Sequence, residues 1–297
     1  MSWQMGAVGL LMRVTRKRRY ADPDGAGHLL GRPKGPSGPP DEVTRRVDVS
    51  TEQVAGFDVH SVRRPGTPRG ARPVVVHLHG GAYVNEIVAQ HWTFVADLAL
   101  ELDVEVLVPI YGLAPQHTAA EARALCEAVL DGVGERPCWL SGDSSGAGLA
   151  LVATQARVRR GAPALRGLTL LAPWLDLAMG NPELDAAEAR DPWLARAALR
   201  EVARVWADGT PLDDGLVSPL FGEMAGLPPV DLWVGTRDLT HPDTVLLAER
   251  LRAAGVDVTL HEARGAIHVF PLLPVPEGRA AARAIRSRIA DGLGTAG

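Results

Sequence analysis

Short runs of consecutive apolar residues alternate along the chain with segments whose apolar residues recur every three or four positions. The apolar runs predict strands at 74–79, 104–108, 138–141, 168–171, 230–234 and 256–261. The recurring spacing predicts helices at about 88–102, 122–129, 149–158 and 244–254. Uninterrupted apolar runs are typical of strands that are buried on both faces. The pattern therefore predicts an α/β fold, in which helices flank a mostly parallel central sheet.

Two segments interrupt this alternation. Residues 176–216 are charged and helical in pattern, contain no predicted strand, and are expected to form a helical cap inserted above the sheet. Residues 1–45 are expected to form an N-terminal helix followed by an arm, because ten of the eighteen residues from Pro23 to Pro40 are Gly or Pro. The prediction is one main domain at 46–297, preceded by this segment.

Composition and charge exclude several classes of function. The net charge of −4 provides no field that would attract nucleic acid. Cys126 and Cys138 have no CxxC spacing, so we expect neither a structural zinc site nor a disulfide framework. The same cysteine usage fits a reducing compartment, so we expect a cytoplasmic location. We also expect no transmembrane segment, since the apolar stretch near the start of the chain is too short to span a bilayer. The sequence leaves a homodimer open.

A basic run at 13–19 follows a short apolar stretch at 6–12. This order is the reverse of a secretory signal, in which the charges come first. We interpret the run as the solvated face of an N-terminal helix. The alternative is a role at a membrane surface or with an acidic partner.

A candidate nucleophile lies where a predicted strand ends and a predicted helix begins. Gly142-Asp143-Ser144-Ser145-Gly146 fits the pattern G-x-S-x-G. At such a turn the central serine is held in a strained conformation at the carboxyl end of the sheet. The glycines on either side are required because the strand and helix backbones come too close for a Cβ. Ser144 is therefore the predicted nucleophile.

A second motif, His79-Gly80-Gly81-Ala82-Tyr83, directly follows another predicted strand. Backbone N–H groups held at such a turn can stabilise the negative charge that develops on a carbonyl oxygen under attack. We assign the donors of this oxyanion hole to Gly81, Ala82 and Ser145, with Gly80 shaping the turn. A phosphate-binding loop is the rival interpretation, but the segment matches neither glycine-rich phosphate motif.

The base and the acid follow from chain order, because a nucleophile on such a turn is followed first by the acid and then by the histidine. His241, His261 and His268 come late enough in the chain. His268 is preferred because it lies in a loop just after the last predicted strand. Asp238 is the predicted acid, since it follows the preceding strand, and Asp243 is the alternative.

Together these motifs resemble those of the hormone-sensitive-lipase-like bacterial esterases, a branch of the α/β-hydrolases. The resemblance covers about residues 73–276 and includes Pro173-Trp174-Leu175-Asp176. It implies an α/β-hydrolase fold with a cap formed by an N-terminal cap segment, which residues 1–45 match, and by an insertion, which residues 176–216 match. Two departures are Ala82, where the family usually has a third glycine, and Ser145, where it often has alanine.

The resulting hypothesis is a serine esterase that cleaves small carboxylic esters through an acyl-enzyme, with no metal or cofactor. Two alternatives stay open. An amidase or deacetylase would use the same three residues, and a binding protein with the same fold would close on a ligand without turnover.

Overall fold

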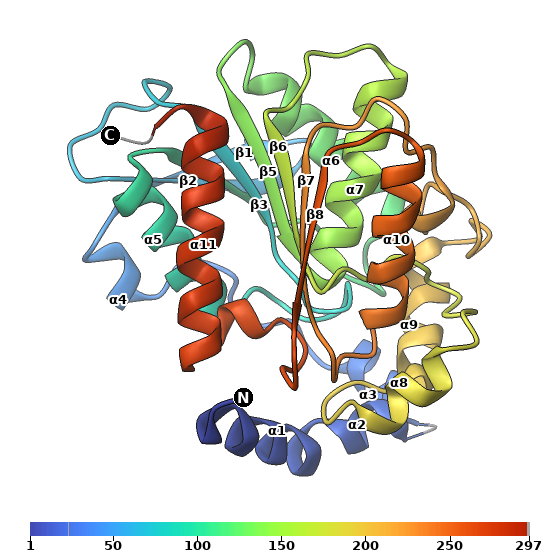
Figure 1. The fold of residues 1–297 in the computed structure, drawn as a ribbon. Coiled ribbons are helices and arrows are strands. Elements are labelled where there is room, and N and C mark those ends of the chain that lie inside the picture. The colour runs from blue at the N-terminus through green and yellow to red at the C-terminus, as the bar shows by residue number, and fades with distance from the viewer. Residues whose placement is uncertain (23, 296–297) are drawn as a thin grey trace.

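The computed structural model describes residues 1–22 and 24–295 and is built on a single eight-stranded sheet (Figure 1). The strand order is β1-β2-β4-β3-β5-β6-β7-β8, and all neighbours from β4 to β8 run parallel. The strands are β1 (Asp48–Val54), β2 (Phe57–Arg63), β3 (Val74–Leu78), β4 (Glu105–Pro109), β5 (Cys138–Asp143), β6 (Gly167–Leu171), β7 (Val230–Gly235) and β8 (Val258–Ala263). The predicted mostly parallel sheet is confirmed, and each predicted strand lies within two residues of its observed bounds.

Helices cover both faces of this sheet and bury separate apolar clusters on its two sides (Figure 1). One face carries α5 (Ala89–Leu102) and α11 (Pro276–Leu293). The other carries α6 (Ala119–Gly132), α7 (Ser144–Arg159) and α10 (His241–Ala253). The strands from β3 to β7 are buried throughout, which is why their sequences read as continuous apolar runs.

The remaining helices gather at one end of the sheet, at the bottom of Figure 1. They come from the N-terminus and from the insertion after β6, and α2 and α3 both pack against α9. They are α1 (Trp3–Thr15), α2 (Lys17–Ala21), α3 (Gly25–Gly31), α8 (Leu184–Arg190) and α9 (Arg196–Ala207), with a short α4 (Asp41–Thr44) and two 3₁₀ turns, Pro219–Phe221 and Phe270–Leu272, elsewhere.

The expectation that 23–40 forms only a loop is wrong for part of that range. Residues 25–31 form α3, although three of the seven are glycine. Ala26 and Leu29 on α3 are buried in the same apolar cluster as Ala198 of α9, so packing offsets the poor helix propensity of glycine. Pro23 lies outside the described residues.

The hairpin β1–β2 was not predicted, because its strands are rich in polar residues. It joins the parallel sheet by pairing antiparallel with β4. Glu105 at the start of β4 reinforces this junction, although its side chain is only 1% exposed. Its carboxylate accepts hydrogen bonds from the Ser61 hydroxyl of β2 at 2.6 Å, from the Gly70 N–H at 3.0 Å and from Arg136. Burial would raise the pKa of Glu105, but these hydrogen bonds outweigh burial and lower it.

We predict that Glu105→Gln lowers the free energy of unfolding by about 2 kcal/mol at neutral pH, because a buried carboxylate partner of Arg136 is lost. A lowered folded-state pKa means that the carboxylate stabilises the fold above its unfolded pKa, and that this stabilisation is lost as pH falls through the folded value. Urea unfolding of both proteins at about pH 7 and about pH 3 should therefore show a difference that shrinks in acid. An equal difference at both values would contradict the charge-based explanation.

Candidate active site

The turn between β5 and α7 presents Ser144 in a strained backbone conformation. Ser144 has φ +51°, a left-handed value that is uncommon for a residue with a Cβ. A Cβ on Gly142 would lie 2.6 Å from the Gly146 carbonyl oxygen, and one on Gly146 would lie 2.1 Å from the carbonyl oxygen of Leu78. Both glycines are therefore required by close backbone contact, as the motif predicts.

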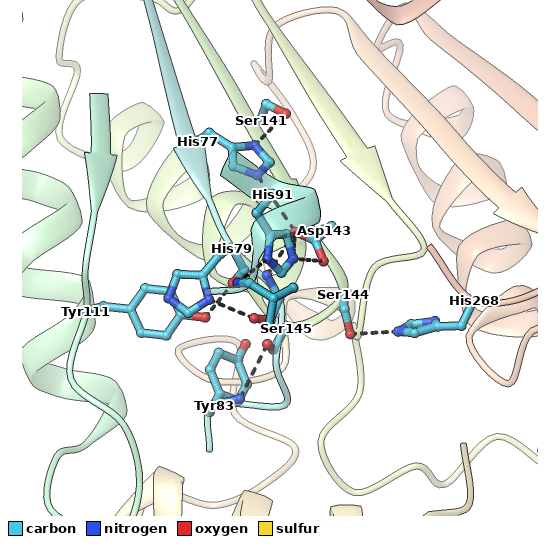
Figure 2. Close-up of polar contacts among 12 residues, drawn as sticks. His77, His79, Tyr83, His91, Tyr111, Ser141, Asp143, Ser144, Ser145 and His268 are labelled. Carbon is cyan, nitrogen blue, oxygen red and sulfur yellow. Dashed lines mark hydrogen bonds and ion pairs between the residues drawn. The ribbon is translucent and has the colours of Figure 1, made fainter. Parts of the chain in front are cut away.

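Ser144, His268 and Asp238 come together at the carboxyl end of the sheet. Nε2 of His268 lies 2.9 Å from the Ser144 hydroxyl oxygen, and its Nδ1 lies 2.9 and 3.0 Å from the two carboxylate oxygens of Asp238. Asp238 and His268 are buried, whereas Ser144 is partly exposed. Figure 2 shows His268 pointing toward Ser144 from a separate loop. The three residues singled out in the sequence thus form one hydrogen-bonded chain.

The other candidates for base and acid have different partners. His261 stacks on Trp233, and its Nε2 lies 2.9 Å from a carboxylate oxygen of Asp231. His241 pairs with Glu262 at 2.7 Å. Asp243 lies in the first turn of α10, where it accepts a hydrogen bond from Asn181. These contacts leave His268 and Asp238 as the histidine and carboxylate linked to Ser144.

A second carboxylate, Asp191, lies behind Asp238 and was not identified from the sequence. It follows α8 in the insertion, and its Oδ2 accepts the backbone N–H of Leu239 at 2.7 Å. Burial, followed by the charge of Asp238, raises the pKa of Asp191. Burial of His268 opposes protonation, but the charges of Asp238 and Asp191 outweigh it and raise the pKa of His268 above 6.5. No local sequence pattern marks Asp191.

The glycine turn after β3 lies beside the serine turn. Gly81 has φ +135° and Ala82 has φ +55°. The Gly80 N–H donates to the Asp143 carboxylate at 2.9 Å, so it is already occupied. The N–H groups of Gly81 and Ala82 have no acceptor in the described part of the chain. Ser145 is the second residue of α7, in the first turn, where the N–H groups have no partner within the helix.

Asp143, the residue before Ser144, holds these two turns together (Figure 2). It accepts from Gly80 and lies 3.2 Å from Nε2 of His91 on α5. The other ring nitrogen of His91, Nδ1, accepts the Val88 N–H at 3.0 Å, so the proton of neutral His91 is on Nε2 and is donated to Asp143. Burial would raise the pKa of Asp143, but the surrounding histidines and the Gly80 N–H lower it to about 2.

The neighbouring histidines His77 and His79 are buried and neutral. Burial lowers the pKa of His77 to about 3 and that of His79 to about 4. The His79 ring stacks on Tyr111, whose hydroxyl donates to the His79 backbone carbonyl. Among residues 1–22 and 24–295, no group of three or more His, Cys, Asp or Glu side chains is placed to hold a metal ion.

Two tryptophans of the insertion contact residues of the site. The Trp193 ring meets the His268 ring edge-on, with 5.6 Å between centroids. Trp206 on α9 is fully buried and stacks on Tyr83, the residue after Ala82, at 4.4 Å. The insertion is therefore packed against both the histidine loop and the glycine turn.

Comparison with known proteins gives consistent results. Residues 75–272 match a family described as having the α/β-hydrolase fold. An acetyl-hydrolase of Streptomyces hygroscopicus is 32% identical over 70% of this chain and 72% of its own length. An esterase of Acinetobacter venetianus is 30% identical over 63% of this chain and 64% of its own.

A solved esterase of the bacterial hormone-sensitive lipase family superposes with a TM-score of 0.79 at 25% identity, covering 99% of both chains. The resemblance to this group is thus confirmed. The matched segment contains the serine turn, the glycine turn and the loops of Asp238 and His268, and this chain therefore belongs to the family of proteins with the α/β-hydrolase fold.

Proposed function

We propose that this carboxylic ester hydrolase cleaves small esters by two-step acyl transfer on Ser144. His268 takes the proton of Ser144 as its oxygen attacks the ester carbonyl, and then gives that proton to the leaving alcohol. Water, deprotonated by the same histidine, hydrolyses the acyl-enzyme in the second step. The observation that carries this proposal is the position of His268, within hydrogen-bonding distance of both Ser144 and Asp238.

The oxyanion in this mechanism is held by the N–H groups of Gly81, Ala82 and Ser145. The first two are free of other acceptors among the described residues, and the third is at the N-terminus of α7, where the helix dipole favours negative charge. Gly80 has a different role, since its N–H fixes the turn to Asp143.

The helices at the carboxyl end of the sheet act in this proposal as the cap. The cap comprises α1–α3 and residues 176–216, and the rest of residues 46–297 form the hydrolase domain. Its contacts with His268 through Trp193 and with Tyr83 through Trp206 support this role, because they place the insertion against the histidine loop and the glycine turn. A large side chain this close to His268 limits the room for the acyl group, so we expect a preference for short acyl chains.

A panel of chromogenic esters and amides tests the proposed function. We predict turnover of acetate and butyrate esters, slower turnover of long-chain acyl esters and little turnover of anilides. Ser144→Ala should abolish turnover of every ester while leaving the thermal unfolding temperature nearly unchanged, because the hydroxyl is partly exposed at a turn. Faster cleavage of amides would support an amidase or deacetylase, and tight ester binding without turnover would support a binding protein.

The pH dependence should report the charges around His268. Only neutral imidazole accepts the serine proton, so kcat/KM should fall as pH drops through the raised pKa of His268, above 6.5. Asp191→Asn removes one of the charges that raise this pKa, so the acid limb of the profile should move to lower pH. An unshifted acid limb in a folded variant would show that Asp191 does not act on His268.

We further predict that Asp143→Asn lowers kcat by roughly tenfold or more and changes KM little, since the oxyanion donors act mainly in the transition state. The new amide would direct an N–H at the Nε2–H of His91, whose tautomer is fixed by the Val88 N–H. Steady-state kinetics with 4-nitrophenyl acetate measures both constants. A rise in KM with kcat unchanged would show that Asp143 affects substrate binding and not the oxyanion hole.

A further inference from the structure

Helix α1 turns an apolar face to the solvent. Trp3, Leu10, Leu11 and Val14 are exposed by 78%, 65%, 54% and 64%. Together with exposed Ala7 they form what we call the outer stripe, because residues three and four apart lie on one face of a helix. Residues of the opposite face, including Met5 and Gly9, are buried against the protein.

Such a stripe is not repeated elsewhere in the described residues. Apart from Met1, which precedes α1, the other exposed large apolar side chains are Val88, Val205, Leu216 and Phe221, which come from four different segments. Single exposed apolar residues are normal on protein surfaces, whereas contiguous exposed apolar patches mark interaction sites.

Cationic side chains follow the outer stripe directly. Arg13, Arg16, Arg18 and Arg19 are exposed, and within residues 1–22 and 24–295 their side chains have no ion-pair or hydrogen-bond partner. Lys17 in the same run behaves differently, since its Nζ donates to the carbonyl oxygens of Glu188 at 2.8 Å and of Leu194. Lys17 therefore anchors this region to the insertion, and the four arginines remain free for a partner.

Helix α1 also lies close to the residues of the candidate site. A Cβ on Gly9 would lie 3.7 Å from the Arg237 side chain and 3.8 Å from those of Ile267 and Pro192. Arg237 and Ile267 immediately precede Asp238 and His268 in the chain. Figure 1 shows α1 and α2 at the same end of the molecule, with α8 and α9 beside them. A partner bound to the outer stripe would thus lie next to the active site.

We propose that the outer stripe and the four arginines dock this protein on the surface of an anionic lipid bilayer. An apolar helix face with adjacent cationic residues binds such an interface. The apolar side chains insert among the acyl chains of the lipids, and the arginines contact the anionic headgroups. A second copy of this chain fits the face less well, because a twofold contact would bring two arginine clusters together. No helix in the described residues is long and apolar enough to cross the bilayer, so the helix lies along the surface.

The docked orientation also indicates which esters the protein cleaves. This inference about the substrate rests on the proposed function. Esters dissolved in the bilayer would reach Ser144 directly, with a small acyl group in the active site and a lipophilic alcohol remaining toward the membrane. An acetate ester of a long-chain alcohol combines such a small acyl group with such a lipophilic alcohol.

Docking is tested without turnover by using Ser144→Ala protein and vesicle cosedimentation. We expect binding to vesicles containing phosphatidylserine that is at least tenfold stronger than binding to phosphatidylcholine alone, since each arginine near an anionic surface strengthens partitioning by roughly fivefold. Adding Leu10→Gln and Leu11→Gln should weaken binding by roughly tenfold or more. Leu216→Gln, at an exposed leucine outside α1, is the matched control and should leave binding unchanged.

The substrate class is tested in protein with Ser144 intact. The Leu10→Gln/Leu11→Gln variant should cleave water-soluble 4-nitrophenyl acetate at the wild-type rate but cleave a long-chain alkyl acetate in anionic vesicles at least several-fold more slowly. Failure of wild type to bind anionic vesicles, or equal binding by the variant, would overturn the docking proposal. A stable dimer that this variant dissociates would assign the face to a second copy. Vesicle binding without cleavage of either ester would refute the proposed function and leave docking intact.

Discussion

The site depends on one backbone constraint, the close approach of α7 to the ends of β3 and β5. The carbonyl of Leu78 leaves no room for a side chain at Gly146, and the Gly146 carbonyl leaves none at Gly142. Only with both glycines can the chain turn sharply enough to place Ser144 at φ +51°. The cost of this strained residue is offset by burial of almost all of α7. The position of the partly exposed Ser144 hydroxyl and that of the Ser145 N–H at the start of α7 follow from this contact.

Asp143 fixes the position of the serine turn relative to the rest of the site. Its carboxylate fixes the glycine turn through Gly80 and is itself fixed by His91 on α5, so three elements distant in sequence share one buried charge. A buried carboxylate is tolerated only where donors surround it, which gives the two turns a defined relative position. Asp191 does the same for the acid loop, because it joins the insertion to Leu239. The insertion is thus connected to the reacting groups by hydrogen bonds and by Trp193.

Helix α1 combines two faces with different functions. Its inner face packs on the loops that carry Asp238 and His268, while its outer stripe remains apolar and exposed. An apolar helix face that stays exposed is typical of an interaction surface, which is the basis of the docking proposal. The four arginines that follow the outer stripe have no ion-pair partner within residues 1–22 and 24–295, and their charge is the reason for proposing an anionic surface. Under the docking proposal, the helix that packs on these loops would also determine where the protein meets its substrate.

The sequence by itself determined the parallel sheet and the chain order of Ser144, Asp238 and His268. Buried strands need continuous apolar runs, and a serine turn needs its two glycines, so local composition carried this information. The helix α11 could have been found from Ala281, Ile285, Ile289 and Leu293, which recur every four residues. The hairpin β1–β2, the helix α3 and the roles of Asp143, His91 and Asp191 were decided only by tertiary structure. Each depends on a partner distant in the chain, such as β4, α9, Gly80 or Leu239. The spacing of residues within a segment cannot indicate a contact with a remote segment, so these features could not be predicted from the sequence.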